Sequence, residues 1–424
     1  MEKIKIYKGN IIFTKIPEKF EVLENGYIIV SDSKIKKVCK ELPWEYNDIK
    51  IEDYSDKIIM PSFVDLHLHG PQFENMGLGM DKELLPWLET YTFPEESKFK
   101  DLEYAKKVYM NLINELWENG TTRSVVFGTI HRESTEYLAD LFIKYGFGAY
   151  VGKVNMDINS PDTLVESTSE SLLETKNFLR NYAGVSSRVK PIITPRFIPT
   201  CSGTLLSGLS DLAREYSVPV QSHLSENKGE IEWVSELHPE CKNYSAVYDK
   251  YGLLGGDIKT VMAHCVHCDE DEIKMLKDRG VFVAHCPTSN LNVYSGIAPI
   301  KKYMKLGMNV GIGSDISGGH TLSMMKCIVS AIQSSKMYYL YIDDSYGMLT
   351  LSEAFYLATK GGGKFFGCSG SFEEGYDFDA LIVDDSAIYS VLNKDVEQRL
   401  EKLIYSGNTS CIIKRFAFGE QLEK

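Results

Sequence analysis

The sequence predicts an α/β protein, a (β/α)8 TIM-like barrel with a small β-sandwich domain built from both chain termini. Its middle alternates apolar β-prone runs with helical patterns, which is typical of parallel βα units. Both ends carry short β-prone runs without helices between them. The length of 424 residues suits such a barrel with an appended domain. We expect residues 1–60 and 371–424 to form the small domain and residues 61–370 the barrel.

The β-prone runs of the two ends are short and are separated by turn residues such as Asn25-Gly26. They are Ile11–Phe13, Tyr27–Val30 and Lys34–Val38 near the N-terminus, and Ala380–Asp384 and Cys411–Lys414 near the C-terminus. Because the chain both starts and ends in short strands, we expect the two ends to contribute to one small domain.

Eight further β-prone runs occur in the middle of the chain, with helical patterns between them. They are 61–69, 124–127, 149–154, 189–194, 218–223, 260–264, 281–285 and 309–314. An aromatic-rich insertion, residues 70–99, follows the first run. The helix after it spans about residues 100–119, with apolar residues at helical spacing, and ends at Gly120.

Composition excludes several classes of protein. Hydrophobic residues make up 43% and charged residues 25%, which provides for a sizeable core. A net charge of −13 argues against a nucleic-acid partner, and no apolar run approaches the roughly 18 residues that a membrane span requires. The N-terminus lacks the pattern of a signal peptide, so we expect a cytoplasmic protein. Cys265 and Cys268 form a CxxC without a second pair, and we interpret them as packing residues.

Metal-binding residue types stand at the ends of the predicted barrel strands. His67 and His69 end the first strand and face the same way, because alternate side chains of a strand share a face. Further strands end at His223, His264, His285 and Asp315. Parallel barrels place such residues together at one face. Imidazoles with one carboxylate favour zinc or iron over magnesium or calcium.

Several motifs resemble those of a known family. PSFVDLHLHGPQ, VQSHLSEN, VMAHC, AHCPTSN and GIGSDISGG are similar to the ordered motifs of the amidohydrolase superfamily, in its metal-dependent deaminase branch. LLPWL, YTFP, KVNMD, TPRF and KNY resemble the guanine deaminases within that branch. The resemblance covers about residues 55–370, and the terminal segments match only in general arrangement.

The resemblance implies one divalent ion per subunit of a homodimer, zinc with iron as the alternative. The implied ligands are His67, His69, His223 and Asp315. The implied reaction is hydrolytic deamination of guanine to xanthine and ammonia, in which a metal-activated hydroxide attacks C2. Glu226 is expected to be the proton shuttle, His264 to polarise the water, and Asp315 to accept a proton. His285 is expected to be structural.

The resemblance implies that Gln72, Arg196, Phe197 and Trp87 bind the substrate. An amide and a guanidinium can read a purine edge, and aromatic rings can stack on it. Alternatives stay open at this point: Trp87 and Phe93 also suit the core, and Arg196 could pair with a carboxylate. A different aminated heterocycle or a chlorinated triazine is the alternative substrate. The remote alternative is a noncatalytic scaffold of the dihydropyrimidinase-like kind, although such scaffolds lack the ligand residues that this chain has.

Overall fold

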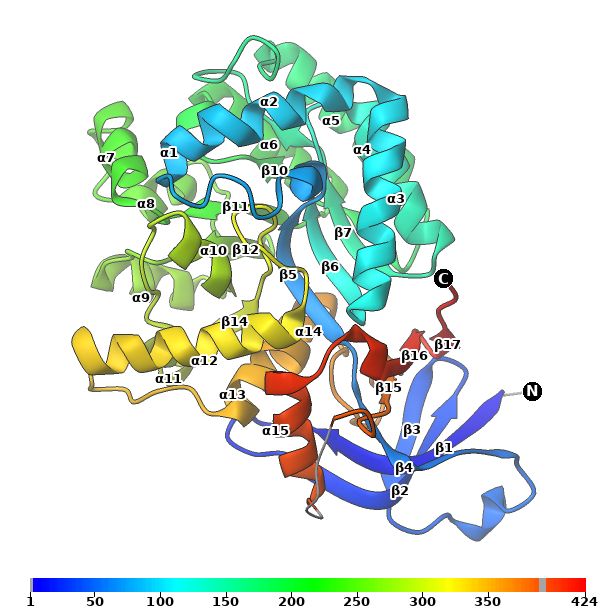
Figure 1. The fold of residues 1–424 in the computed structure, drawn as a ribbon. Helices are drawn as coiled ribbons and strands as arrows, with labels where there is room; N and C mark the ends of the chain where they lie inside the picture. The colour runs from blue at the N-terminus through cyan, green and yellow to red at the C-terminus, as the bar shows by residue number, and fades with distance from the viewer. Residues whose placement is uncertain (1–2, 389–393) are drawn as a thin grey trace.

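The computed structural model describes residues 3–388 and 394–424. It consists of an α/β part with parallel strands and a β-rich part in which both ends of the chain lie (Figure 1). The helices lie around the outside of the parallel strands (Figure 1). None of the helices in the described ranges is both long and apolar enough to span a membrane.

The parallel strands form two four-stranded sheets and one short pair. Their bounds are β5 Phe63–His69, β6 Thr121–Phe127, β7 Gly148–Gly152 and β9 Val189–Pro191; β11 Val220–Leu224, β12 Thr260–His264, β13 Phe282–His285 and β14 Asn309–Ile312; and the pair β8 Val154–Asn155 and β10 Thr194–Pro195. Each of the eight predicted barrel strands has its counterpart in one of the two four-stranded sheets. All residues of β5, β6, β11 and β12 are buried, as expected for strands covered on both faces.

Backbone hydrogen bonds join the two four-stranded sheets at both of their edges. Asp315 N, just beyond β14, donates to His67 O of β5 at 2.8 Å. At the other edge Ile193 pairs with Val220 of β11, and Gln221 N donates to Ile193 O at 2.9 Å. The carboxyl ends of all these strands therefore meet at one face.

The helices follow the strands that they cover. Their bounds are α1 Leu84–Trp87, α2 Phe93–Glu96, α3 Leu102–Glu118, α4 Arg132–Lys144, α5 Thr168–Tyr182, α6 Gly203–Tyr216, α7 Lys228–Leu237, α8 Tyr244–Lys250, α9 Glu270–Asp278, α10 Pro287–Asn292, α11 Ile300–Lys305, α12 Met324–Tyr341, α13 Leu351–Tyr356, α14 Gly362–Phe366 and α15 Val396–Ser406. The predicted helix at residues 100–119 is α3. The Asp101 side chain caps it by accepting from Glu103 N, and Gly120 ends it with a φ of +70°.

The two chain ends build one seven-stranded sheet of order β17-β16-β15-β4-β1-β2-β3. The strands are β1 Ile4–Phe13, β2 Glu21–Ser31, β3 Lys34–Cys39, β4 Ile51–Pro61, β15 Ala380–Val383, β16 Ile412–Ala417 and β17 Glu420–Gln421. The prediction of a joint β structure from both ends is confirmed in this respect. The sandwich stays a prediction. Strand β4 pairs with both β1 and β15 in one hydrogen-bonded sheet, and the sheet's edge strand β3 also bonds to the segment before β15, where Lys34 pairs with Asp377 and Ile35 N donates to Tyr376 O at 2.8 Å.

Candidate active site

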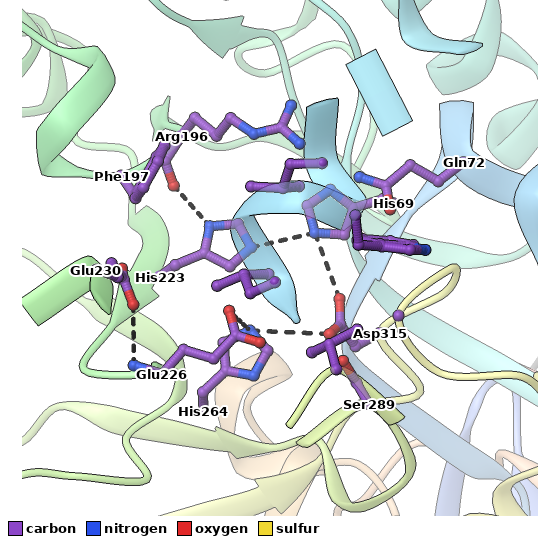
Figure 2. Close-up of a pocket in the computed structure, with 15 residues that line it drawn as sticks. His69, Gln72, Arg196, Phe197, His223, Glu226, Glu230, His264, Ser289 and Asp315 are labelled. Atoms are coloured by element: carbon purple, nitrogen blue, oxygen red, sulfur yellow. Dashed lines mark hydrogen bonds and ion pairs between the residues drawn. The ribbon is translucent and has the colours of Figure 1, made fainter. Parts of the chain in front are cut away.

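The four predicted metal ligands and His264 lie at the carboxyl ends of four parallel strands, and Figure 2 shows His69, His223, His264 and Asp315 among them. His67 and His69 come from β5, His223 from β11 and His264 from β12, and Asp315 follows β14. All five are buried. The convergence follows from the fold, because parallel strands of neighbouring sheets present their carboxyl ends at one face.

The distances between these side chains fit a single cation. His69 Nε2 lies 3.1 Å from His223 Nε2, His67 Nε2 lies 3.0 Å from Asp315 Oδ1, and His69 Nε2 lies 3.4 Å from the same oxygen. Two tetrahedral zinc ligands, each about 2.0–2.2 Å from the ion, stand roughly 3.3–3.6 Å apart. The third of these distances falls in that range, and the other two are slightly shorter. His67 Nε2 is also buried without a hydrogen bond of acceptable geometry to any described residue. The donor set therefore fits a metal.

Burial keeps the two facing imidazoles neutral, which is the form that binds metals. It lowers the pKa of His69 to about 4, and it lowers the pKa of His223 well below its usual value, with neighbouring histidines adding to the effect. His223 Nδ1 lies 2.6 Å from Arg196 O. Because a carbonyl only accepts, Nδ1 carries the proton and the Nε2 lone pair is free to bind a cation.

A second grouping, His67, His264, Cys286 and Asp315, is also close enough to hold a cation. Cys286 weakens it as a site, because burial raises the pKa of its thiol well above the usual value, with Asp315 next in importance. A metal ligand must be the thiolate. The Cys286 Sγ lies 3.4 Å from Ala284 O, where it donates as a thiol. The histidine-rich set therefore remains the better cation site.

Glu226 stands beside this set and is placed for proton transfer. Its Oε2 lies 3.3 Å from His264 Nε2, and its Oε1 accepts a hydrogen bond from Ser295 Oγ at 3.0 Å. Burial, followed by the nearby charge of Asp315, raises the pKa of Glu226 to about 8, while Ser295 opposes the rise. At neutral pH such a carboxyl holds a proton that it can donate.

His264 lies between Glu226 and the candidate ligands. Its Nε2 is 3.8 Å from Asp315 Oδ2, and its Nδ1 is 2.9 Å from Asn290 Oδ1. The amide oxygen accepts, so Nδ1 donates and, in the neutral ring, Nε2 is left as an acceptor toward Glu226. His285, by contrast, is buried and does not line the pocket next to the ligands.

A pocket opens directly onto the candidate ligands, and all four predicted substrate residues line it. Its lining comprises His69, Gln72, Leu84, Trp87, Leu88, Arg196, Phe197, His223, Glu226, Glu230, His264, Ser289, Val293, Asp315 and Gly318. In Figure 2, Arg196 and Gln72 lie on one side of His69 and His223, and Glu226 and His264 lie on the other. A ligand in the pocket would thus contact polar side chains at both ends.

The structure answers the alternatives that the sequence left open. Trp87 both lines the pocket and packs in a core cluster with Phe93, and its Nε1 donates to Leu78 O at 2.9 Å. Phe93 does not line the pocket. Arg196 lines the pocket and also pairs with a buried carboxylate, because its Nη1 donates to Glu96 Oε2 at 2.5 Å.

Three residues beside the site, Glu96, Glu230 and Ser295, were not singled out from the sequence. Glu96 lies in the aromatic-rich insertion and reaches Arg196 across 100 residues of sequence. Glu230 accepts from Glu226 N at 3.1 Å. For Glu230 a signal was present: Asn227 and Glu230 have the spacing of a capping box, which the structure contains.

Facing neutral imidazoles, a carboxylate and a proton-holding glutamate at the carboxyl face of parallel strands define a hydrolase of the metal-dependent class. The comparison with known families agrees, since the amidohydrolase family model matches residues 58–420. The chain belongs to the amidohydrolase family.

Similar proteins are found among both sequences and structures. The guanine deaminase of Dictyostelium discoideum is 37% identical, covering 99% of this chain and 98% of that protein. The guanine deaminase of Escherichia coli (strain K12) is 34% identical, covering 95% and 88%. A crystal structure of guanine deaminase from C. acetobutylicum, with bound guanine in the active site, has 50% identity and a TM-score of 0.97, covering 99% and 100%. A triazine hydrolase from "Arthobacter aurescens", 18% identical, shares the fold.

Proposed function

We propose that this chain is a guanine deaminase that hydrolyses the C2 amine of guanine and releases xanthine and ammonia. The observation that carries the proposal is the pocket, in which hydrogen-bond donors on Gln72 and Arg196 lie across the histidine cluster from Glu226. Such an arrangement can hold a purine by one edge while its far side meets the acid/base group. The relative from C. acetobutylicum, at 50% identity, has guanine bound in its active site.

We assign one divalent cation to His67, His69, His223 and Asp315, zinc with iron as the alternative. When bound, a cation of this kind supplies activated water at neutral pH. Cations with this preference for nitrogen ligands also suit the neutral state of His69 and His223.

The chain's own residues handle the protons. Water contributes its oxygen to C2, one of its protons ends on ring N3, and the other leaves with the amine as ammonia. Glu226, which holds a proton near neutral pH, donates to N3 and then carries a proton to the departing amine. Asp315 receives the first proton that the water loses and returns it to Glu226 after ammonia leaves, while the proton that Glu226 carries to the amine is the second one from the water. His264, 3.3 Å from Glu226, keeps that carboxyl in place.

The pocket residues orient the purine. Gln72 and Arg196 donate to its acceptor edge, and Phe197 and Trp87 confine the ring. The Phe197 ring lies 6.1 Å from that of Trp233 in an edge-to-face contact, which holds it against the pocket.

The proposal extends to the fold and to the domains. Hydrogen bonds at both edges of the two four-stranded sheets support one (β/α)8 barrel of residues 61–370. Residues 1–60 and 371–424 then form the second domain, through their common sheet. A homodimer and a cytoplasmic location stay predictions.

The test is an assay on the purified chain, with its metal content measured first. We expect about one zinc or iron per chain, ammonia release from guanine, and xanthine as the other product. Removing the metal with a chelator should abolish turnover, and adding zinc or iron should restore it. Adenine and a chlorinated triazine serve as comparison substrates. Ammonia release from neither guanine nor any related purine would overturn the proposal.

A further inference from the structure

The buried carboxylate of Glu96 bridges the two pocket residues that face the purine. Glu96 ends the short helix α2 and is 2% exposed. Its Oε1 accepts from Gln72 Nε2 at 2.8 Å, and its Oε2 accepts from Arg196 Nη1 at 2.5 Å. We propose that Glu96 is the positioning residue that makes the pocket present only hydrogen-bond donors to the purine edge, and thereby selects guanine. This inference rests on the proposed function.

Glu96 determines which way the Gln72 amide points. The Gln72 Oε1 accepts from both Ser317 N, at 3.1 Å, and Ser317 Oγ, at 3.3 Å. A flipped amide would place its NH2 group against the Ser317 N–H and its oxygen against the Glu96 carboxylate. Both contacts would then be repulsive. The remaining Nε2 proton is therefore the group that Gln72 has left for the pocket that it lines.

Helix α2 also fixes Arg196. The Arg196 and Glu96 side chains are 4% and 3% exposed, so their ion pair is shielded from water. The guanidinium also lies over the ring of Phe93, 5.1 Å from its centroid, and Phe93 is on the same helix. Among the residues that the structure describes, Glu96 is the only carboxylate within ion-pair distance of Arg196. Glu96 thus neutralises Arg196 and sets its direction, while the other guanidinium protons remain donors.

An edge made only of donors discriminates between purines. Guanine presents acceptors at O6 and N7, whereas adenine presents an amine donor at C6. A C6 amine would face the Gln72 and Arg196 donors and leave buried groups unpaired, which is the strongest form of polar discrimination. Without Glu96, only the Ser317 N–H still opposes a flip of the Gln72 amide, so the flipped form, which shows its oxygen, becomes more populated and the pocket accepts a C6 donor better.

The experiment compares Glu96→Gln with Glu95→Gln in the metal-loaded protein. Glu95 is the neighbouring carboxylate on α2, is 5% exposed, and pairs with Lys98 and Tyr104 instead of the pocket. The substrates are guanine and 2,6-diaminopurine, which keeps the C2 amine, changes the C6 substituent from acceptor to donor, and leaves N1 without its proton. In Glu96→Gln we expect kcat/KM for guanine to fall by about 10–150-fold, mainly through KM, and the preference for guanine over 2,6-diaminopurine to fall about tenfold or more.

Glu95→Gln should keep both quantities within about twofold of the unmodified chain. Glu96→Asp keeps the charge but is too short to bridge both partners, so its preference for guanine over 2,6-diaminopurine should also fall. If Glu96→Gln does not fold, Glu96→Asp alone tests the inference. A preference that stays within about threefold of Glu95→Gln in the folded Glu96 variants would overturn the inference. Absence of guanine turnover in the unmodified chain would instead overturn the proposed function.

Discussion

At the scale of single residues, the backbone of the candidate site is held in conformations that residues other than glycine rarely adopt. His264 has a φ of +71° and Asp315 a φ of +48°, both in the left-handed region. Such a position costs about 1–3 kcal/mol for a residue other than glycine. Asp315 is kept there by hydrogen bonds from its N to His67 O at 2.8 Å and from Gly319 N to its own O at 2.6 Å. The fold therefore holds two residues in unfavourable backbone conformations that direct their polar side chains toward the same point.

Glu226→Gln should retain the metal and bind guanine, yet lose about 10²–10⁴-fold in kcat, because the amide keeps the shape but cannot transfer a proton. Measurements of metal content, guanine binding and kcat check this. Glu232→Gln, an exposed carboxylate on α7, is the control and should behave as the unmodified chain. Near-normal kcat in Glu226→Gln would assign the proton transfer to another group, with His264 the next candidate.

The candidate site could be predicted where local sequence determines geometry. His67 and His69 are two residues apart on one strand, and His223 ends another, so their common face follows from strand periodicity and parallel pairing. Glu96 could not be predicted in this way. Its partners are 24 and 100 residues away in sequence, and only the packing of the insertion brings them together.

At the scale of elements, helix α7 holds the loop that carries Glu226. Its capping box uses the Asn227 and Glu230 side chains, and Glu230 Oε2 also accepts from Glu226 N at 3.1 Å. Tyr244 OH donates to Glu230 Oε1 at 2.7 Å. Glu230 is fully buried, and this burial, followed by the charge of Glu226, raises its pKa to about 7. The first turn of the helix therefore contains a carboxyl that favours its neutral form.

Glu230→Gln should change how stability depends on pH. The folded chain holds the Glu230 proton more tightly than the unfolded chain, whose pKa is near 4.5, so this group lowers stability as pH rises from about 4.5 to 7 and adds no slope above that. Glutamine does not titrate. The difference in free energy of unfolding, variant minus unmodified chain, should therefore be about 2–3 kcal/mol larger at pH 8 than at pH 5. Denaturant unfolding of both at the two pH values measures it, and parallel pH curves would contradict the expectation.

The elements that the sequence predicted best are those with one strong period. The eight parallel strands are buried apolar runs, and α3 has a clear apolar face. Strand β4 escaped prediction because polar residues interrupt it, among them Asp53 and Asp56. The insertion at residues 70–99 breaks into short 3₁₀, α and π segments, with Pro86 and Pro94 inside two of the helical turns. Helices of four residues have too little periodicity to be found from sequence.

At the scale of the whole molecule, a buried arginine joins the α/β part to the seven-stranded sheet. Arg123 of β6 donates from Nε to Asp379 Oδ2 at 2.8 Å and from Nη2 to Asp377 Oδ2 at 2.9 Å. Its guanidinium also lies 3.8 Å from the centroid of the Phe418 ring. Asp379 Oδ1 accepts from Phe418 N at 2.7 Å, which ties the last strands into the same network.

Arg123→Met should cost about 3–5 kcal/mol of stability, because it leaves two carboxylates without their buried partner. Thermal and denaturant unfolding measure the loss, and kcat of the folded fraction should be unchanged because Arg123 does not line the pocket. Arg132→Met is the matched control: Arg132 also pairs with two carboxylates, Glu136 and Glu174, but it is 25% exposed and should cost about 1 kcal/mol or less. Equal losses in the two variants would show that Arg123 has no special joining role.

The pairing of β4 with β15 has a consequence for how the protein is made. Pro61 lies opposite Ala380, so β4 can pair with β15 only after about 320 further residues have been synthesised. At roughly 5–20 residues per second, that interval is about 16–64 s. During this interval one edge of β4 has no partner strand, and unpaired strand edges promote association between chains. Slow translation of the middle of the gene should therefore lower the yield of folded protein more than slow translation of its last codons.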